Sequence, residues 1–164
     1  FSGEIGHFPL LNNNQICHCG KMGCLETGAS GSAVHRIFLE KLKEGRTSML
    51  SDKFNRGETI HIEEIIDAVN EEDVLVIEVV EEIGTTLGRA IAGLINLFNP
   101  ELIVIGGNVA ITREYLLLPI KSAIQKHSLN IINSDTTIKF SKLGRKAGAI
   151  GSCMLSRSKL LGLL

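Results

Sequence analysis

The chain has 164 residues, of which 44% are hydrophobic and 21% are charged, so it is typical of a globular protein rather than a disordered one. Its 17 basic and 18 acidic residues give a net charge of -1, without a Lys/Arg block that would attract a phosphate backbone. Its longest apolar stretches fall well short of the roughly 20 residues that cross a bilayer, so no membrane partner is expected.

The first half of the chain predicts mainly helices. Apolar residues at helical spacing predict two short helices before position 70. Segments that are polar, or rich in Gly, Asn and Cys, are predicted to be loops. In order, we expect a structured loop from Phe1 to Glu26, a helix over 32–43, a polar loop over 45–58 and a short helix over 61–69.

The strongest helical pattern runs from Asp73, a plausible N-cap, to Phe98, and Asn99-Pro100 stops it. Three glycines at positions 84, 88 and 93 lie inside this pattern, and each costs about 1 kcal/mol relative to alanine. We therefore expect another backbone to approach this helix closely along its glycine face.

Two short strands are predicted in the second half. Residues 102–105 form a buried apolar run that ends at Gly106-Gly107, and residues 136–140 alternate. Thr112 is expected to cap a helix over 113–127, and a last helix over 147–161 is expected to bury Cys153. Strands alternating with helices indicate an α/β fold. Two strands are few for a sheet and the chain opens without Met, so we expect it to be incomplete at its N-terminus.

Three of the four cysteines lie within eight residues, at Cys17, Cys19 and Cys24, and His7 precedes them. Three thiolates and one imidazole form a closed tetrahedral zinc site, and Gly20 and Gly23 free the backbone to bring Cys24 round. Such crowding favours a metal in a reducing cytoplasm over a secreted disulfide framework. Two alternatives remain open, a set of buried thiols and a site in which His18 replaces His7.

These residues carry a resemblance to a known family. Gly3-Glu4-Ile5-Gly6-His7, followed by Cys17-x-Cys19-Gly20-x-x-Gly23-Cys24-Leu25-Glu26, resembles the signature of the ROK family of bacterial repressors and sugar kinases. Leu87-Gly88, Asn96-Leu97-Phe98-Asn99-Pro100 and Ile103-Val104-Ile105-Gly106-Gly107 extend the resemblance over nearly the whole chain.

The resemblance implies the C-terminal lobe of an actin-like ATPase (ribonuclease H-like) fold over residues 1–164. Residues 1–26 would form the sugar-site and zinc loop, and residues 27–164 would form helices with strands near 102–106 and 136–140. It also implies sugar contacts from Glu4, His7 and Glu26, and a nucleotide-side turn at Gly106 and Gly107. Taken alone, the two carboxylates could be solvated loop residues and the glycine pair a tight turn.

Three functions remain open: the sugar-binding and dimerisation part of a transcriptional regulator, the matching half of an ATP-dependent hexose or amino-sugar kinase, and a zinc-stapled assembly module. The Gly106-Gly107 pair favours a kinase. The run at 96–100 and the polar insertion at 45–58 resemble regulators of the N-acetylglucosamine repressor type, which we prefer.

On this interpretation the partners are a small sugar or amino sugar and a second copy of the chain. DNA would be bound only through an absent N-terminal domain. ATP and Mg²⁺ would matter only in a kinase, whose catalytic aspartate the resemblance places upstream of Phe1, so no catalytic residue is expected here.

Overall fold

The computed structural model describes residues 3–163, apart from the side chains of residues 132, 133 and 145. Its helices are α1 (Gly31–Lys43), α2 (Ser51–Asn55), α3 (Ile62–Asn70), α4 (Val74–Phe98), α5 (Glu114–His127), α6 (Asn130–Asn133) and α7 (Ala147–Leu160), and its strands are β1 (Leu102–Ile105) and β2 (Thr137–Phe140). Short 3-10 helices lie at Ile5–His7, Leu25–Thr27, Val109–Thr112 and Gly144–Lys146. Within residues 3–163, no helix is both long enough and apolar enough to span a bilayer.

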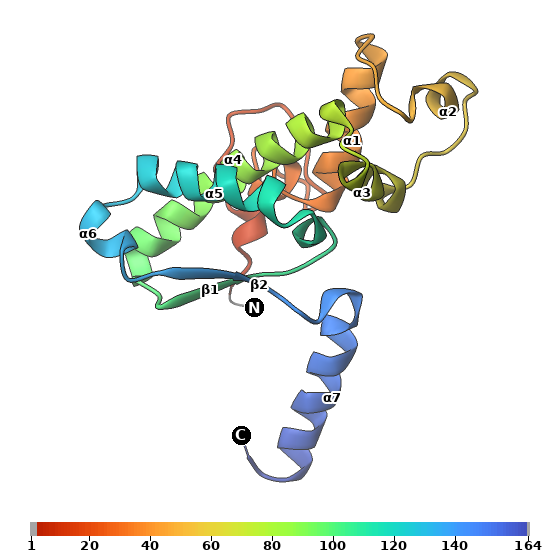
Figure 1. Cartoon of the computed structure of the whole chain (residues 1–164). Coiled ribbons are helices and arrows are strands. Elements are labelled where there is room, and N and C mark those ends of the chain that lie inside the picture. The colour runs from red at the N-terminus through yellow and green to blue at the C-terminus, as the bar shows by residue number, and fades with distance from the viewer. Residues whose placement is uncertain (1–2, 164) are drawn as a thin grey trace.

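Helix α4 is the centre of the fold (Figure 1). The side chain of Asp73 caps it by accepting from the backbone N–H of Val76 at 3.1 Å, and Asn99 ends it in the left-handed conformation. One face of α4 is buried against α1 and α3, and Phe38 of α1 is fully buried there. The 3.6-residue period of the apolar side chains therefore sets both the helix and its contacts.

Helix α5 packs closely along α4 through two glycines. A Cβ atom at Gly88 would lie 2.6 Å from the carbonyl oxygen of Ile120, and one at Gly84 would lie 2.6 Å from Cγ of Pro119. The expected close approach of a second backbone is therefore found at these two positions. It does not extend to Gly93, around which a Cβ would meet no atom within 4 Å.

The two strands pair in parallel, from Leu102 opposite Thr137 to Ile105 opposite Phe140, and α5 lies on the crossover between them. Two parallel strands need such a crossover, because the chain must return to the starting end of the sheet before the second strand begins. Ile105 is buried in the core, whereas Leu102 and Val104 are exposed. The strand expected over 136–140 begins one residue later.

Several local predictions are wrong. The segment 45–58, predicted as a loop, contains α2. Thr112 does not cap α5, because its hydroxyl donates to the carbonyl of Val109 at 2.7 Å inside a 3-10 helix and α5 begins at Glu114. Cys153 is exposed rather than in the core.

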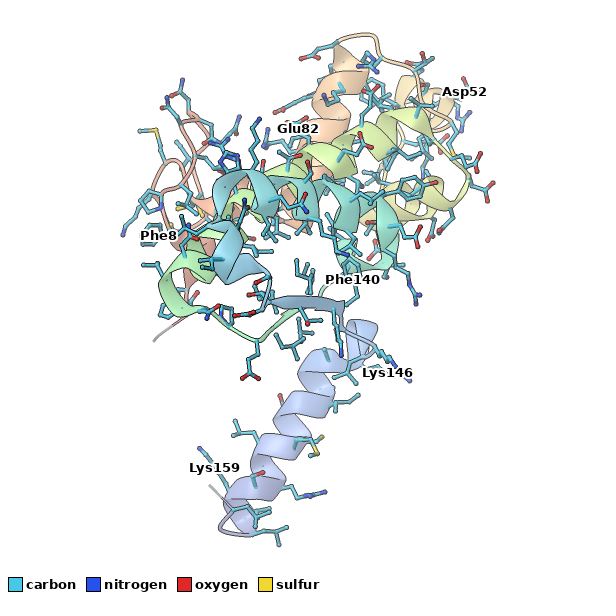
Figure 2. The ribbon with its side chains drawn as sticks, turned by 60° about the vertical axis from the view of Figure 1, so that its left-hand side comes forward. Phe8, Asp52, Glu82, Phe140, Lys146 and Lys159 are labelled. Carbon is cyan, nitrogen blue, oxygen red and sulfur yellow. The ribbon has the colours of Figure 1, made fainter. Side chains whose placement is uncertain are left out.

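The exposure of Cys153 follows from the position of α7. This helix extends away from the other elements (Figure 1). Lys159, near its end, lies far from the other helices and strands (Figure 2). None of its residues is buried, and its apolar side chains are spread around the helix instead of forming one stripe. The core position was predicted because the sequence places Cys153 on the apolar face of the last helix, but no element among residues 3–163 buries that face.

Candidate metal centre

The N-terminal loop is folded back on itself by two short antiparallel contacts. Pro9 bridges Cys24, and Ile16 bridges Met22. The hairpin between Ile16 and Met22 is closed by the Cys17 N–H donating to the Lys21 carbonyl at 2.8 Å. A Cβ at Gly23, where φ is +75°, would overlap the carbonyl oxygen of Leu11. Gly23 therefore has to be glycine for the chain to bring Cys24 against the first segment.

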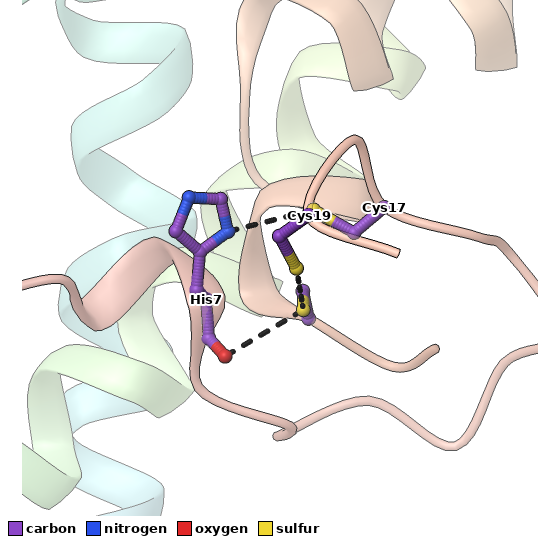
Figure 3. A group of neighbouring side chains, drawn as sticks. His7, Cys17 and Cys19 are labelled. Atoms are coloured by element: carbon purple, nitrogen blue, oxygen red, sulfur yellow. Dashed lines mark hydrogen bonds between the residues drawn. The ribbon is translucent and has the colours of Figure 1, made fainter. Parts of the chain in front are cut away.

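This folding gathers four potential metal ligands (Figure 3). Nδ1 of His7 lies 3.5 Å from Sγ of Cys17, Sγ of Cys19 lies 3.6 Å from Sγ of Cys24, and all four ligand atoms lie within 4.8 Å of one another. His18, the alternative ligand, is not part of this group.

The spacing suits zinc. With Zn–S bonds of about 2.3 Å and Zn–N bonds of about 2.0 Å, the edges of a tetrahedral site are about 3.5 Å between nitrogen and sulfur and about 3.8 Å between two sulfurs. The two contacts in the structure, 3.5 Å and 3.6 Å, are close to these values. The donor set, three thiols and one imidazole, also belongs to a structural rather than a catalytic zinc site, because it fills all four positions.

The three thiols have different environments. Cys17 is 4% exposed and Cys24 is fully buried, whereas Cys19 is exposed. Burial raises the pKa of Cys24 to about 11. A hydrogen bond from the backbone N–H of Lys21 lowers the pKa of Cys19 to about 7. Near neutral pH, Cys19 thus holds the more readily formed thiolate of these two.

The expected sugar-contacting residues lie beside this group. Glu4 and His7 belong to one 3-10 turn, in which the His7 N–H donates to the Glu4 carbonyl at 3.1 Å. Glu26 follows Cys24 in the next 3-10 turn, and its Oε2 would lie 3.0 Å from a Cβ placed on Gly6. The carboxylate of Glu26 therefore lies against the backbone next to His7.

Three residues that we did not single out from the sequence hold the turn that carries Glu26. The Thr27 hydroxyl donates to the Cys24 carbonyl at 2.8 Å, and Nδ2 of Asn13 donates to that hydroxyl at 3.2 Å. Nη2 of Arg36 donates to the Thr27 carbonyl at 2.9 Å. The only local signal was the i,i+4 spacing of Arg36 and Glu40, which indicates a surface ion pair and not this bond.

Gly106 and Gly107 lie elsewhere, at the end of β1. They line a cavity of about 260 Å³ together with residues 29–31, at the start of α1, and apolar side chains that include Leu87. Gly107 has a φ of +93°, which favours glycine. The glycine pair and the N-terminus of α1 thus line one cavity, and none of the four Cys/His residues lines it.

Comparison with known proteins gives relatives of two kinds. The chain is 35% identical over 159 residues to a glucokinase of Halalkalibacterium halodurans, covering 96% of this chain and 48% of that protein. It is also 35% identical over 162 residues to the DNA-binding transcriptional dual regulator NagC of Escherichia coli K12, covering 99% of this chain and 39% of that protein. The chain thus spans half or less of these relatives.

The structure is similar to that of a ROK family glucokinase from Streptomyces griseus in complex with glucose and AMPPNP, with a TM-score of 0.81 and 26% identity. The match covers 96% of this chain and 52% of that one. The α/β class predicted from the sequence is confirmed, and the similar solved structures include ROK sugar kinases, which have the actin-like ATPase fold, and a ROK family transcriptional regulator homologous to the E. coli MLC protein (TM-score 0.74, 36% identity, covering 85% of this chain and 34% of that one). The sequence profile described as "ROK family" matches residues 1–159, and the chain belongs to the ROK family.

Proposed function

We propose that this chain is the sugar-binding and oligomerisation part of a ROK transcriptional regulator of carbohydrate metabolism. The observation that carries the sugar site is the position of the Glu26 carboxylate against Gly6, next to His7. DNA would be bound by a domain outside these residues. A small sugar or amino sugar would be the effector.

The Cys/His group would hold one structural zinc ion through His7, Cys17, Cys19 and Cys24, in the reducing conditions of the cytoplasm. When bound, the ion would supply rigidity and no open coordination position. The chain's own contacts already bring the two 3-10 turns together, because the Leu25 N–H donates to the Phe8 carbonyl at 3.0 Å. The metal would then fix the His7 ring relative to Glu26.

The chemistry of these residues suits a ligand rich in hydroxyl groups. Nδ1 of His7 faces Cys17, which leaves Nε2 on the other side of the ring to donate to a hydroxyl (Figure 3). The carboxylates of Glu4 and Glu26 can accept from neighbouring hydroxyls. The glucose named for the Streptomyces griseus structure is a ligand of this class.

A kinase is the second candidate, and the cavity beside Gly106 and Gly107 favours it. Backbone N–H groups at the start of a helix attract phosphate, and the cap of α1 at Ser30 lies on this cavity. In that case ATP and Mg²⁺ would bind there in the whole protein. The two relatives at 35% identity, one glucokinase and one regulator, do not separate the candidates. The preference for a regulator therefore rests on the residues at 96–100 and on the 45–58 insertion.

Assembly is the remaining part of the proposal. Apolar side chains at the end of α4 and on β1 are widely exposed, among them Leu97 at 76% and Phe98 at 73%. Exposed apolar clusters of this kind mark interaction surfaces. We expect at least a dimer. A monomer mass from light scattering at micromolar concentration would contradict this part of the proposal.

The test uses the full-length protein, a panel of hexoses and N-acetylated hexosamines, ATP and operator DNA. Sugar-dependent release from DNA without ATP turnover, abolished by Glu26→Ala and kept in Glu81→Ala on the exposed side of α4, would support the regulator. Rapid sugar-dependent ATP turnover that Glu26→Ala abolishes would establish the kinase instead. Sugar binding that Glu26→Ala leaves intact would overturn the sugar site itself.

The 164 residues alone should not phosphorylate any sugar. Phosphoryl transfer needs a base on the sugar hydroxyl and donors around the phosphate, held together in one geometry. Glu4 and Glu26 could hold hydroxyl groups but are not expected to supply that base. Measurable kinase activity from the purified chain would show that the catalytic group lies within it.

A further inference from the structure

The three thiols of the Cys/His group differ in their access to solvent. Cys17 and Cys24 are buried, and Cys19 is exposed in the turn of the Ile16–Met22 hairpin. The Gly20 N–H closes this turn by donating to the Cys17 carbonyl at 2.8 Å, and Gly20 itself has a φ of +83°. A small oxidant arriving from solvent therefore meets the sulfur of Cys19 before that of either neighbour.

The thiol of Cys24 lies beside that of Cys19. Sγ of Cys24 lies 3.6 Å away, and a disulfide would require an S–S distance of about 2.05 Å, so the two sulfurs must approach by about 1.5 Å. Cys24 is held by its bridge to Pro9 and lies next to Leu25, whose N–H donates to Phe8. The approach therefore falls to Cys19, which lies in the exposed turn of the hairpin and is followed by Gly20.

We propose that Cys19 is a modification site for hydrogen peroxide or a similar two-electron oxidant, with Cys24 as its resolving thiol. The Cys19 thiolate attacks one peroxide oxygen, the O–O bond breaks, hydroxide leaves and a sulfenic acid forms. The Cys24 thiolate then attacks the Cys19 sulfur, the S–O bond breaks and a second hydroxide leaves. The two thiolates lose two electrons in total, and the peroxide becomes two hydroxide ions, which take up two protons to give water.

The modification would act on the proposed function through the metal site. A Cys19–Cys24 disulfide removes two of the four proposed ligands and leaves His7 and Cys17, too few to hold zinc tightly. Glu26 lies two residues after Cys24, so the turn that presents its carboxylate loses the support of the metal and keeps only its hydrogen bonds. A thiol reductant with added zinc reverses the change, since a disulfide is reducible. The consequence for sugar rests on the proposed function, whereas disulfide formation does not.

Cys153 provides an internal control. It is exposed like Cys19, but it lies on α7, and no thiol among residues 3–163 is grouped with it. Exposure alone would make both cysteines react with peroxide and stop at the sulfenic or sulfinic acid. Cys19, unlike Cys153, has a second thiol at 3.6 Å with which it can form an intramolecular disulfide.

The experiment treats the zinc-loaded chain with substoichiometric to excess hydrogen peroxide beside a chromogenic zinc chelator. Differential alkylation and peptide mapping then assign each thiol. We expect a Cys19–Cys24 disulfide, release of about one zinc per chain in step with it, and unchanged behaviour in Cys153→Ser. Reduction with added zinc should restore the starting state.

Three results would overturn the proposal: first oxidation at Cys17 or Cys24, oxidation of Cys19 without a bond to Cys24, or a disulfide that leaves zinc bound. A chain purified without metal is tested by the mapping alone, which requires the same disulfide. Sugar binding by the reduced full-length protein is measured separately. Failure of the redox step and failure of the sugar site therefore give different patterns.

Discussion

Gly6 and Glu26 face each other across the two 3-10 turns of the N-terminal loop: a Cβ on Gly6 would lie 3.0 Å from Oε2 of Glu26. This distance is shorter than an ordinary contact between carbon and oxygen. Glycine at position 6 therefore leaves room for the carboxylate in its present position. A larger residue before His7 would crowd the Glu26 carboxylate, and glycine avoids this because it has no side chain.

Gly6→Ala is expected to displace the Glu26 carboxylate and weaken sugar binding by the full-length protein. Loss of one hydrogen bond to a charged group costs about 1.5–3 kcal/mol, which corresponds to roughly a tenfold to hundredfold higher Kd. Calorimetric titration with the effector sugar measures the change. Gly148→Ala on α7, where a Cβ meets no atom within 4 Å, serves as the control. Equal affinity in both variants would contradict the role assigned to Gly6.

The purified chain should contain about one zinc ion, and Cys19→Ser should lose most of it, because three ligands bind far more weakly than four. In that variant, hydrogen exchange should speed up over residues 3–26 and stay slow in α4, whose buried face does not depend on the metal. Cys153→Ser should keep its zinc. Elemental analysis that finds no zinc in the unmodified chain, purified without chelators, would rule out the site.

Two glycines in α4 should respond in opposite ways to alanine. Gly88→Ala forces its methyl group against the backbone of Ile120, and such overpacking costs about 1–3 kcal/mol of the free energy of unfolding. Gly93→Ala meets no atom within 4 Å and should stabilise the helix by about 1 kcal/mol through helix propensity. Denaturant unfolding of the two variants checks this. Similar midpoints for both would mean that α4 and α5 do not pack as closely as described.

The stability of the α3 region should depend on pH through Glu64. Its pKa is lowered because its carboxylate accepts from the backbone N–H of His61, at 2.9 Å, and pairs with Lys53. A lowered pKa in the folded state means that the stabilisation is complete above the unfolded value of about 4.3 and is lost as the pH falls through the folded value.

Glu64→Gln should therefore unfold at a lower temperature than the unmodified chain at pH 7. The difference should shrink as the pH falls below about 5, because protonation then removes the same charge. Asp67→Asn, at an exposed position of the same helix, is the matched control. A Tm difference for Glu64→Gln that is independent of pH would argue against an electrostatic origin.

Long elements could be predicted from the sequence, and short ones could not. The predicted helix over 73–98 and the strand over 102–105 agree with α4 and β1 to within one residue, because their apolar residues repeat over enough positions to define a period. Helix α2 has only five residues, too few to show such a period. Thr112 is a residue type that favours caps, but its hydroxyl found a nearer carbonyl partner.

The Cys/His group was accessible to prediction because ligand chemistry and spacing are encoded locally. The residues that support it were not, since their contacts depend on the tertiary fold. Arg36 reaches the Thr27 carbonyl because the orientation of α1 relative to the preceding loop brings the two residues together. The buried carboxylate of Asp73 likewise accepts from the Ser48 hydroxyl at 2.6 Å and from the Met49 N–H at 2.7 Å, in addition to capping α4. The sequence predicts that Asp73 caps α4, but it does not predict the hydrogen bonds to Ser48 and Met49.

Helix α7 has 14 residues and buries none of them. An isolated helix of that length is marginal in water, because few residues repay the entropy of nucleation. If a partner surface covers α7, binding would stabilise the helix, so we expect the helical content of this segment to rise with the concentration of that partner by mass action. The C-terminal segment would then report on assembly: a coil when the surface is absent, a helix when it is occupied.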